Sequence, residues 1–299
     1  MIQINGVTKY YGDFKSLDAI SAHIADGSIF GLVGSNGSGK STLLRVMCGI
    51  FRADEGEVLY DGANVYENVK LKDTVVYLSD DQYFLPNSSL RDMAKMYASL
   101  YSGFSWEEFD KLVGIFGLPA NRKISTFSKG MQKQAAILLG LSARPCYLLC
   151  DETFDGLDPV MRQLVKRILA DAVAEHGLTP IIASHNLREL EDICDHIGLL
   201  HKGGILFESE IDSLKENIHT VQAVFSRPIG TETIAAMGTV SIKQRGSMVT
   251  AVVRGSESEV REKVEALAPD FYEIIPLTLE EIFISEMEER GYDYTKVVF

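Results

Sequence analysis

A glycine-rich segment spanning residues 34–41 has the composition of a phosphate-binding loop. It reads Gly34-Ser35-Asn36-Gly37-Ser38-Gly39-Lys40-Ser41, and it lies between the apolar run 29–33 and the helix-like stretch 42–47. A G-x-x-x-x-G-K-[ST] pattern between a strand and a helix predicts a cradle for a nucleotide phosphate, because its glycines let backbone N–H groups converge and the helix N-terminus attracts anions. The alternative is an ordinary Gly/Ser loop, which the flanking strand and helix disfavour. The predicted nucleotide-binding residues of this segment are Gly34, Ser35, Asn36, Gly37, Ser38, Gly39, Lys40, Ser41 and Thr42.

Within this loop, two side chains have expected roles of their own. Lys40 is expected to reach the β- and γ-phosphates of the nucleotide, and the hydroxyl of Ser41 is expected to bind Mg²⁺. An acidic pair, Asp151 and Glu152, follows the apolar run 147–150. A first acid in this place can hold the Mg²⁺ of a nucleotide and a second can polarise an attacking water, so Asp151 is the predicted metal ligand and Glu152 the predicted base. Without the phosphate loop, a helix N-cap would be the better interpretation of this pair.

The composition narrows the function classes. The 299 residues carry a formal net charge of −13 and an isoelectric point near 5.0, whereas a sequence-independent nucleic-acid binder needs a basic stripe. No nucleic-acid partner is therefore expected. The four cysteines lie in apolar runs without metal-ligand spacing, which indicates small buried side chains in a reducing compartment. Neither a signal peptide nor a run of about 18 apolar residues is evident, so we expect a cytoplasmic location.

The order of apolar runs predicts the architecture that positions these residues. Up to about residue 208, strand-like runs alternate with helical stretches, as in a mostly parallel sheet covered by helices. Four runs end in polar residues, where the carboxyl edge of such a sheet binds ligands. A helical insertion is expected between 85 and 128, with helices over 89–101 and 105–116, the second opened by a Ser105/Glu108 capping box. The four runs are 29–33, 75–78, 147–150 and 181–183.

A different pattern follows residue 208. Apolar runs and helical stretches there have the order β-α-β-β-α-β, which suggests a small ferredoxin-like module, followed by a final helix over 278–289. Arg245-Gly246 is the expected hairpin turn, and capping boxes are expected at Ser256/Glu259 and Thr278/Glu281.

The segment Phe127-Ser128-Lys129-Gly130-Met131 opens an apolar helix over 131–141. Together with the phosphate loop and the acidic pair, it makes the chain resemble the nucleotide-binding subunit of an ATP-binding cassette (ABC) transporter, whose signature motif most often reads Leu-Ser-Gly-Gly-Gln. The resemblance implies that Ser128, Gly130 and the helix N-terminus hold the γ-phosphate bound on the opposite subunit, an arrangement consistent with anion binding at helix ends.

Three further positions follow the order of that family. Asp158, in the segment 154–159, matches the D-loop and is expected at a dimer interface. His185, at the end of the apolar run 181–183 and Ser184, matches the switch histidine that contacts the γ-phosphate and helps to position the attacking water. Tyr11 matches the aromatic residue that stacks on adenine, although the neighbouring Tyr10 could serve instead. Lys40, Glu152 and His185 are thus the expected catalytic residues.

One position departs from the family pattern. The family places a glutamine after the second long strand, and this chain has Asp80 there, with Gln82 two residues later. A carboxylate oxygen is a harder ligand for Mg²⁺ than an amide oxygen, so Asp80 is predicted to replace the glutamine as a metal ligand. In the family this glutamine senses the γ-phosphate and relays its presence to the helical insertion. The replacement by Asp80 puts that coupling in question.

The resemblance implies a fold and a function for the whole chain. The expected fold is an α/β P-loop NTPase domain of the ABC type over 1–215, with a helical subdomain at about 85–140, followed by a small α+β accessory module over 216–299. The expected function is that of an ATPase with ATP and Mg²⁺ as cofactors, which forms a homodimer or heterodimer and powers a separate membrane permease on the inner face of the cell membrane. Features of the segments 184–195 and 277–283 favour export.

Two other classes remain as alternatives. One is a cassette ATPase that acts on ribosomes or DNA, but such proteins usually carry two cassettes or long coiled coils. The other is a small-molecule kinase that shares only the phosphate loop, and the motifs at Ser128, Asp158 and His185 disfavour it.

Overall fold

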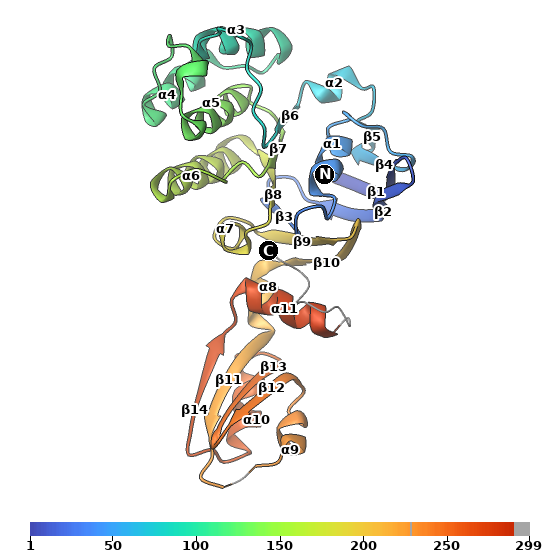
Figure 1. Ribbon diagram of the computed structural model, residues 1–299, viewed down its shortest axis with the longest axis vertical. Coiled ribbons are helices and arrows are strands. Elements are labelled where there is room, and N and C mark those ends of the chain that lie inside the picture. Colours follow the sequence, from blue (N-terminus) through green and yellow to red (C-terminus); the bar gives the residue numbers. More distant parts are fainter. Residues whose placement is uncertain (228, 290–299) are drawn as a thin grey trace. The chain divides into compact units, whose positions relative to one another are not determined.

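The computed structural model describes residues 1–227 and 229–289. The chain divides into two compact units, Met1–Glu208 and a second that begins at Ser209 (Figure 1). The sequence-based boundary lay after residue 215, so helix α8 (Ile211–Glu216) belongs with the second unit rather than the first. Residues 290–299 of the predicted accessory module lie outside the described residues. In the part of the chain that the structure describes, no helix is long and apolar enough to cross a membrane.

A six-stranded sheet forms the centre of the first unit, with the order β10-β9-β3-β8-β7-β6. The neighbours β9, β3, β8, β7 and β6 pair in parallel, and every residue of β3, β7 and β8 is buried. Strands of this kind are covered on both faces. In Figure 1, α1 (Lys40–Met47) lies on one side of the sheet, and α6 (Pro159–His176) and α7 (Leu187–Glu191) lie on the other. The strands are β3 (Phe30–Val33), β6 (Val75–Leu78), β7 (Tyr147–Asp151), β8 (Thr179–Ser184), β9 (His196–His201) and β10 (Gly204–Glu210).

The first unit also contains a separate antiparallel sheet that the sequence analysis did not predict. Its order is β2-β1-β4-β5, and β1 and β2 form a hairpin in which Tyr11 pairs with Phe14. These strands alternate between buried and exposed residues, because one face packs on the core and the other meets solvent. A shared core that includes Ile4, Leu44 and Leu149 joins the two sheets through α1. The strands are β1 (Ile2–Tyr11), β2 (Phe14–Ile24), β4 (Glu55–Tyr60) and β5 (Ala63–Asn64).

The predicted helical insertion is present. It contains α3 (Leu90–Leu100), α4 (Trp106–Phe116), the 3₁₀ turn η1 (Ile124–Thr126) and α5 (Lys129–Ser142), and the short helix α2 (Val69–Lys72) precedes it. Ser105 caps α4 by accepting from Glu108 N–H, but the carboxylate of Glu108 pairs with Lys111 instead of completing the box. The reason is that the backbone N–H of Ser105 already donates to Ser142 O, at 2.8 Å.

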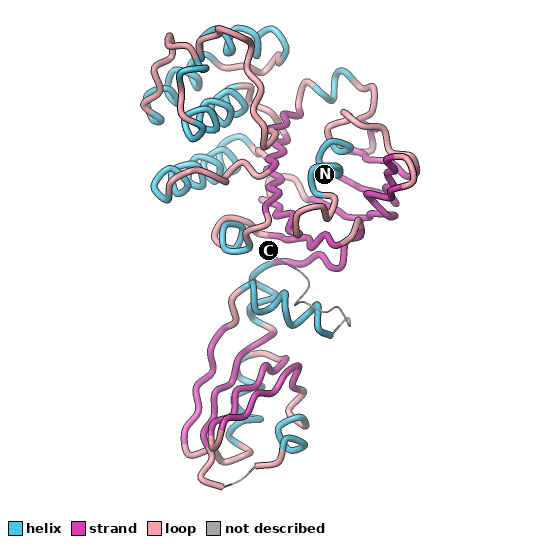
Figure 2. Tube along the Cα trace, in the orientation of Figure 1, coloured by secondary structure: helices cyan, strands magenta, loops and turns pink. Residues whose placement is uncertain are grey.

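The second unit has its own sheet (Figure 2), and buried side chains form a hydrophobic core of its own. Its sheet order is β12-β13-β11-β14 with antiparallel neighbours throughout, which is the arrangement of a split βαβ module. The capping boxes at Ser256/Glu259 and Thr278/Glu281 are present. Its elements are β11 (Ile218–Val224), α9 (Thr231–Ala235), β12 (Thr239–Arg245), β13 (Met248–Arg254), α10 (Glu257–Glu265), β14 (Phe271–Pro276) and α11 (Leu279–Glu289).

The cysteines differ from expectation at one position. Cys48, Cys150 and Cys194 are buried, as expected from their apolar surroundings, whereas Cys146 is exposed. Cys146 directly precedes β7, and its side chain therefore lies where the chain enters the sheet rather than inside it.

Candidate active site

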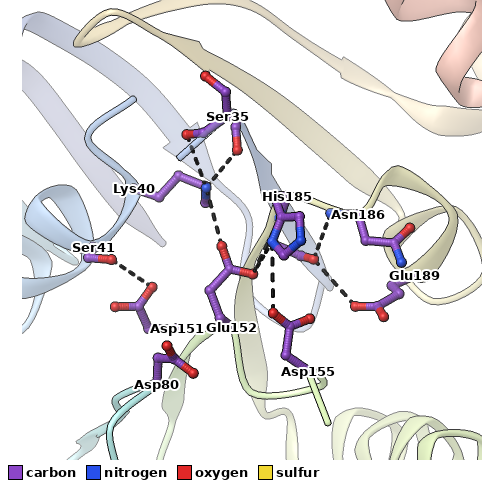
Figure 3. A network of polar contacts seen from close by, with 12 residues as sticks. Ser35, Lys40, Ser41, Asp80, Asp151, Glu152, Asp155, His185, Asn186 and Glu189 are labelled. Carbon is purple, nitrogen blue, oxygen red and sulfur yellow. Dashed lines mark hydrogen bonds and ion pairs between the residues drawn. The ribbon is translucent and has the colours of Figure 1, made fainter. Parts of the chain in front are cut away.

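The candidate site lies at the carboxyl edge of the parallel sheet, where β3, β7 and β8 end. β3 leads into the phosphate loop and α1, β7 ends in Asp151, and β8 ends one residue before His185. Because these strands are adjacent and parallel, their last residues meet at one edge of the sheet. Figure 3 shows the resulting network, in which Lys40 and His185 both point toward the carboxylate of Glu152.

The phosphate loop has the geometry that its glycines suggest. Gly39 has a φ of +110°, in the left-handed region, directly before α1, and a side chain at Gly34 would place its Cβ 2.4 Å from Leu200 O. The ammonium of Lys40 lies inside the loop and donates to Gly34 O at 2.6 Å and to Ser35 O at 3.4 Å. The hydroxyl of Ser38 is buried and has no hydrogen-bond partner among the described residues, so an anion in the cradle would give it one.

Two oxygen donors for a divalent cation lie side by side. The hydroxyl of Ser41 donates to Asp151 Oδ1 at 2.9 Å, and Asp151 is buried at the end of β7. The other carboxylate oxygen accepts from the phenol of Tyr77 at 2.9 Å, a contact that the sequence analysis missed. Burial and the negative charge of Asp151 raise the pKa of Tyr77, so the phenol stays protonated as a donor. Hydroxyl and carboxylate oxygens are the donors that Mg²⁺ prefers, so these residues fit that ion.

Glu152 occupies a strained backbone conformation. Its φ is +48°, a region that residues with a side chain rarely adopt, and its N–H donates to Ala183 O at 3.0 Å. Its Oε1 lies 3.2 Å from Lys40 Nζ, and its Oε2 lies 3.0 Å from His185 Nδ1 and accepts from His185 N–H at 3.3 Å. This strained conformation places the carboxylate of Glu152 between Lys40 and His185, the residue that follows β8. Backbone strain of this kind is common at functional positions.

Asp155 is a further member of the site that the sequence analysis did not single out. Its Oδ2 lies 3.8 Å from His185 Nδ1, and Glu152, Asp155 and His185 together offer ligand atoms close enough to hold a cation. Burial, and then the negative charge of Glu152, raise the pKa of Asp155. Its position three residues after the predicted base was the only sequence signal available.

A cleft opens beside the phosphate loop. Its lining includes Tyr11 but not Tyr10. This favours Tyr11 over Tyr10 as the residue that would stack on the adenine ring of a nucleotide. Tyr11 is 44% exposed, and its ring rests edge-on against Phe51, with ring centroids 6.0 Å apart. Phe14 lines the same cleft, and its pairing with Tyr11 across the β1–β2 hairpin explains why the sequence alone did not reveal it. The cleft is lined by Tyr11, Phe14, Ser16, Asn36, Gly37, Gly39, Lys40, Ser41, Thr42, Asp80 and Glu152.

Asp80 lines this cleft, and its role as a metal ligand stays a prediction. One of its oxygens accepts from Lys133 Nζ at 3.1 Å. Gln82, the neighbouring alternative, does not line the cleft, and its amide donates to Ser79 O within its own loop.

The three residues expected at a subunit interface are not part of the cleft. Ser128 caps α5 by accepting from Met131 N–H at 3.2 Å, and Asp158 caps α6 by accepting from two N–H groups. Gly130 lies near the loop after β7, where an added Cβ would come within 3.5 Å of Gly156 O. Among the described residues that line the cleft, none of these three is present, so the fold of one chain does not bring them to Lys40.

Comparisons with known proteins agree with this site. A sequence model of the family described as ABC transporter matches residues 17–155. The ABC transporter ATP-binding protein YtrB of Bacillus subtilis is 30% identical over 96% of this chain and 98% of its own length, and the bacitracin transport ATP-binding protein BcrA of Bacillus licheniformis is 30% identical over 72% of each chain.

Solved structures share the fold of this chain over about seven-tenths of its length. The ATP-binding subunit of an ABC transporter superposes with a TM-score of 0.66 at 22% identity, covering 72% of this chain and 92% of that chain. A dimeric ATP-binding cassette in a post-hydrolysis state, bound to ADP and phosphate, gives a TM-score of 0.65 at 22% identity, covering 71% of this chain and 99% of that chain. The chain belongs to the ABC transporter family, as one of its ATP-binding and ATP-hydrolysing subunits.

Proposed function

We propose that this chain binds MgATP, dimerises on it and uses its hydrolysis to drive a separate membrane permease in the direction of export. The observation that carries the proposal is the position of Glu152, whose carboxylate contacts Lys40 on one side and His185 on the other. A base held between a phosphate-binding lysine and a second polar group is suited to ATP hydrolysis, in which the protein mainly positions groups and offsets charge.

The residues present fit a magnesium ion. Ser41 and Asp151 would hold it, with Asp80 as the third ligand at the rim of the cleft. When bound, Mg²⁺ offsets the negative charge that develops on the phosphate oxygens.

Hydrolysis then follows from the contacts of this chain. The γ-phosphate attracts the ammonium of Lys40 and thereby frees Oε1 of Glu152 from its ion pair. Glu152 accepts a proton from a water molecule as the water oxygen bonds to the γ-phosphorus and the bond from that phosphorus to the β–γ bridging oxygen breaks. His185 donates to the γ-phosphate. ADP and phosphate are the products, and the proton leaves Glu152 for solvent or phosphate.

Dimerisation supplies the contacts that one chain lacks. Ser128 and the N-terminus of α5 form an exposed anion site, and in the proposed dimer they bind the γ-phosphate held by the other subunit, with Asp158 at the interface. Loss of the γ-phosphate removes these charge-assisted contacts and lets the subunits separate. A second copy of this chain or a related subunit could complete the pair.

The names of the relatives support a transport role. BcrA is named for bacitracin transport, and SrtF of Streptococcus pyogenes, 29% identical over 76% of this chain, is named for lantibiotic transport. The permease would dock at the cytoplasmic face of the membrane near the loop after β6, where the side chains of Tyr83 and Leu85 are exposed.

Glu152→Gln tests this proposal. The variant should bind MgATP with near-wild-type affinity and elute as a dimer in size-exclusion chromatography with light scattering, while its phosphate release falls by about 100-fold or more. A Lys40→Ala control should remain monomeric, because it loses the phosphate contact. A Glu152→Gln protein that stays monomeric at saturating MgATP, alone and with its permease, would refute the proposed dimer.

A further inference from the structure

Lys133 connects two parts of the active site that are far apart in the sequence. It lies in α5, the helix that Ser128 caps. Its ammonium donates to Asp80 Oδ1 at 3.1 Å and to the main-chain carbonyl of Glu152 at 3.0 Å. The side chain of Lys133 is 14% exposed, whereas that of Asp80 is 62% exposed. The largely covered ammonium of Lys133 thus extends from α5 to both the predicted base and the predicted metal ligand.

The contact with Glu152 is made at a strained point of the backbone. The residue has a φ of +48°, its N–H is held by Ala183 O, and its C=O is held by Lys133. A hydrogen bond from a charged donor is stronger than a neutral one. Because hydrolysis depends on the placement of the Glu152 carboxylate to within a fraction of an ångström, loss of the Lys133 contact would misplace the base.

The contact with Asp80 is different, since it is made to a side chain. Lys133 donates to Oδ1 alone, which leaves Oδ2 of the same carboxylate as a ligand oxygen for a metal. Lys133 and a divalent cation are both positive, and both use the carboxylate of Asp80. The lysine therefore weakens the attraction between Asp80 and the cation by Coulomb repulsion. The charges of Asp80 and Lys133 also shift the pKa of Asp155. The pair therefore interacts electrostatically with the catalytic cluster formed by Glu152, Asp155 and His185.

We propose that Lys133 is a positioning residue that couples the metal at Asp80 to the catalytic base. It holds the backbone of Glu152 in place for hydrolysis. It also shares the carboxylate of Asp80 with the cation, so metal binding changes the contact between Asp80 and Lys133. Through Lys133 this change reaches α5, the helix that Ser128 caps. This inference rests on the proposed assignment of Asp80 to the metal, and it adds a residue that the motif analysis does not contain.

Metal affinity is the first test. In the Glu152→Gln background with saturating ATP, Mn²⁺ affinity is measured from the free Mn²⁺ signal in electron paramagnetic resonance. Lys133→Met should tighten Mn²⁺ binding by about three- to tenfold, because a positive charge next to a ligand is removed. The tightening should vanish when Asp80→Asn is also present. Asp80→Asn alone should weaken Mn²⁺ binding by about tenfold.

Turnover is the second test. In the otherwise wild-type chain, Lys133→Met should lower kcat by about 10- to 100-fold, with the KM for ATP changed by less than about twofold, because the lost charged hydrogen bond serves the base and not the nucleotide. Lys133→Arg should recover part of kcat. Lys95→Met is the matched control, since Lys95 pairs with Asp92 at the same 3.1 Å distance on the exposed surface of α3, and it should leave both measurements unchanged.

The outcomes separate the two assignments. If Asp80→Asn does not change Mn²⁺ affinity, the metal role of Asp80 is wrong. If Asp80→Asn weakens Mn²⁺ binding but Lys133→Met leaves it unchanged, the Asp80 role stands and the inference about Lys133 is overturned. Circular dichroism checks folding, and Lys133→Gln replaces Lys133→Met in both tests if the methionine variant is unfolded, with the same expected shifts.

Discussion

The position of Asp155 beside Glu152 and His185 destabilises its ionised form in the folded protein. Its carboxyl group is partly buried beside Glu152, and both influences raise its pKa, while His185 and Lys133 act in the opposite direction. A raised pKa means that the folded protein binds the proton more tightly than the unfolded chain does. The contribution to stability is therefore complete below the ordinary pKa of aspartic acid, about 3.9, and is lost as the pH rises through the folded-state value.

Asp155→Asn should consequently stabilise the protein at neutral pH. The asparagine cannot ionise, so the free energy of unfolding of the variant should exceed that of the wild type at pH 7, and the difference should shrink as the pH falls toward 4. Urea unfolding at a series of pH values measures this. Asp73→Asn is a control of opposite sign, because hydrogen bonds from Ser102 lower the pKa of Asp73, and its removal should destabilise the protein at pH 7. An Asp155→Asn effect that does not depend on pH would contradict the explanation.

Two serines cap neighbouring helices in the insertion, and only one is expected to bind phosphate. Ser105 accepts from Glu108 N–H at the start of α4, and Ser128 accepts from Met131 N–H at the start of α5. Replacing either by alanine should cost about 1 kcal/mol of stability through the lost cap. The local contribution to folding is thus the same for both, which makes them a matched pair.

Dimerisation should distinguish the two serines. In the Glu152→Gln background, Ser128→Ala should abolish or strongly weaken the MgATP-dependent dimer, because it removes the anion contact that we propose across the interface. Ser105→Ala should lose a similar amount of stability and keep the dimer. Urea unfolding and size-exclusion chromatography with light scattering give the two quantities. Equal dimer loss in both variants would mean that helix stability, and not phosphate binding, accounts for the effect.

The sequence predicted those elements whose function resides in a continuous segment. The phosphate loop is eight consecutive residues, and Asp151, Glu152 and His185 follow apolar strands, so the parallel-sheet pattern alone placed them at one edge. The contacts of Asp151 with Tyr77 and of Lys133 with Asp80 join residues 74 and 53 positions apart. No local pattern encodes such pairs. The first depends on the parallel pairing of β6 with β7, and the second on how α5 of the insertion packs beside the loop after β6.

The antiparallel sheet was missed for a related reason. Its strands β1, β2 and β4 lie in a region that alternates with helical sequence, and the alternation was interpreted as part of the parallel sheet. The pairing of Ile2 with both Ile24 and Tyr60 is a matter of register between distant strands. Bulges in β1 further blur the period-two pattern that would identify a solvent-facing strand.

The two units have separate hydrophobic cores, which has a consequence for unfolding. One core includes Ile4, Leu44 and Leu149 in the first unit, and another includes Ile234 and Val253 in the second. The residues that line the nucleotide cleft all belong to the first unit. A ligand that binds only the folded first unit stabilises that unit by mass action.

Calorimetry should therefore resolve two unfolding transitions with different responses. ADP at about 100 times its Kd should add about 2.7 kcal/mol to the stability of the first unit and raise one transition, while the other stays in place. Ile234→Ala removes a fully buried side chain from the second core. It should lower the free energy of unfolding of the second unit by about 2–5 kcal/mol and thus lower the midpoint of the ADP-insensitive transition alone. ATP hydrolysis by the isolated chain should stay unchanged. If ADP and Ile234→Ala move both transitions together, the two cores unfold as one cooperative system and the accessory module contributes directly to the stability of the ATPase.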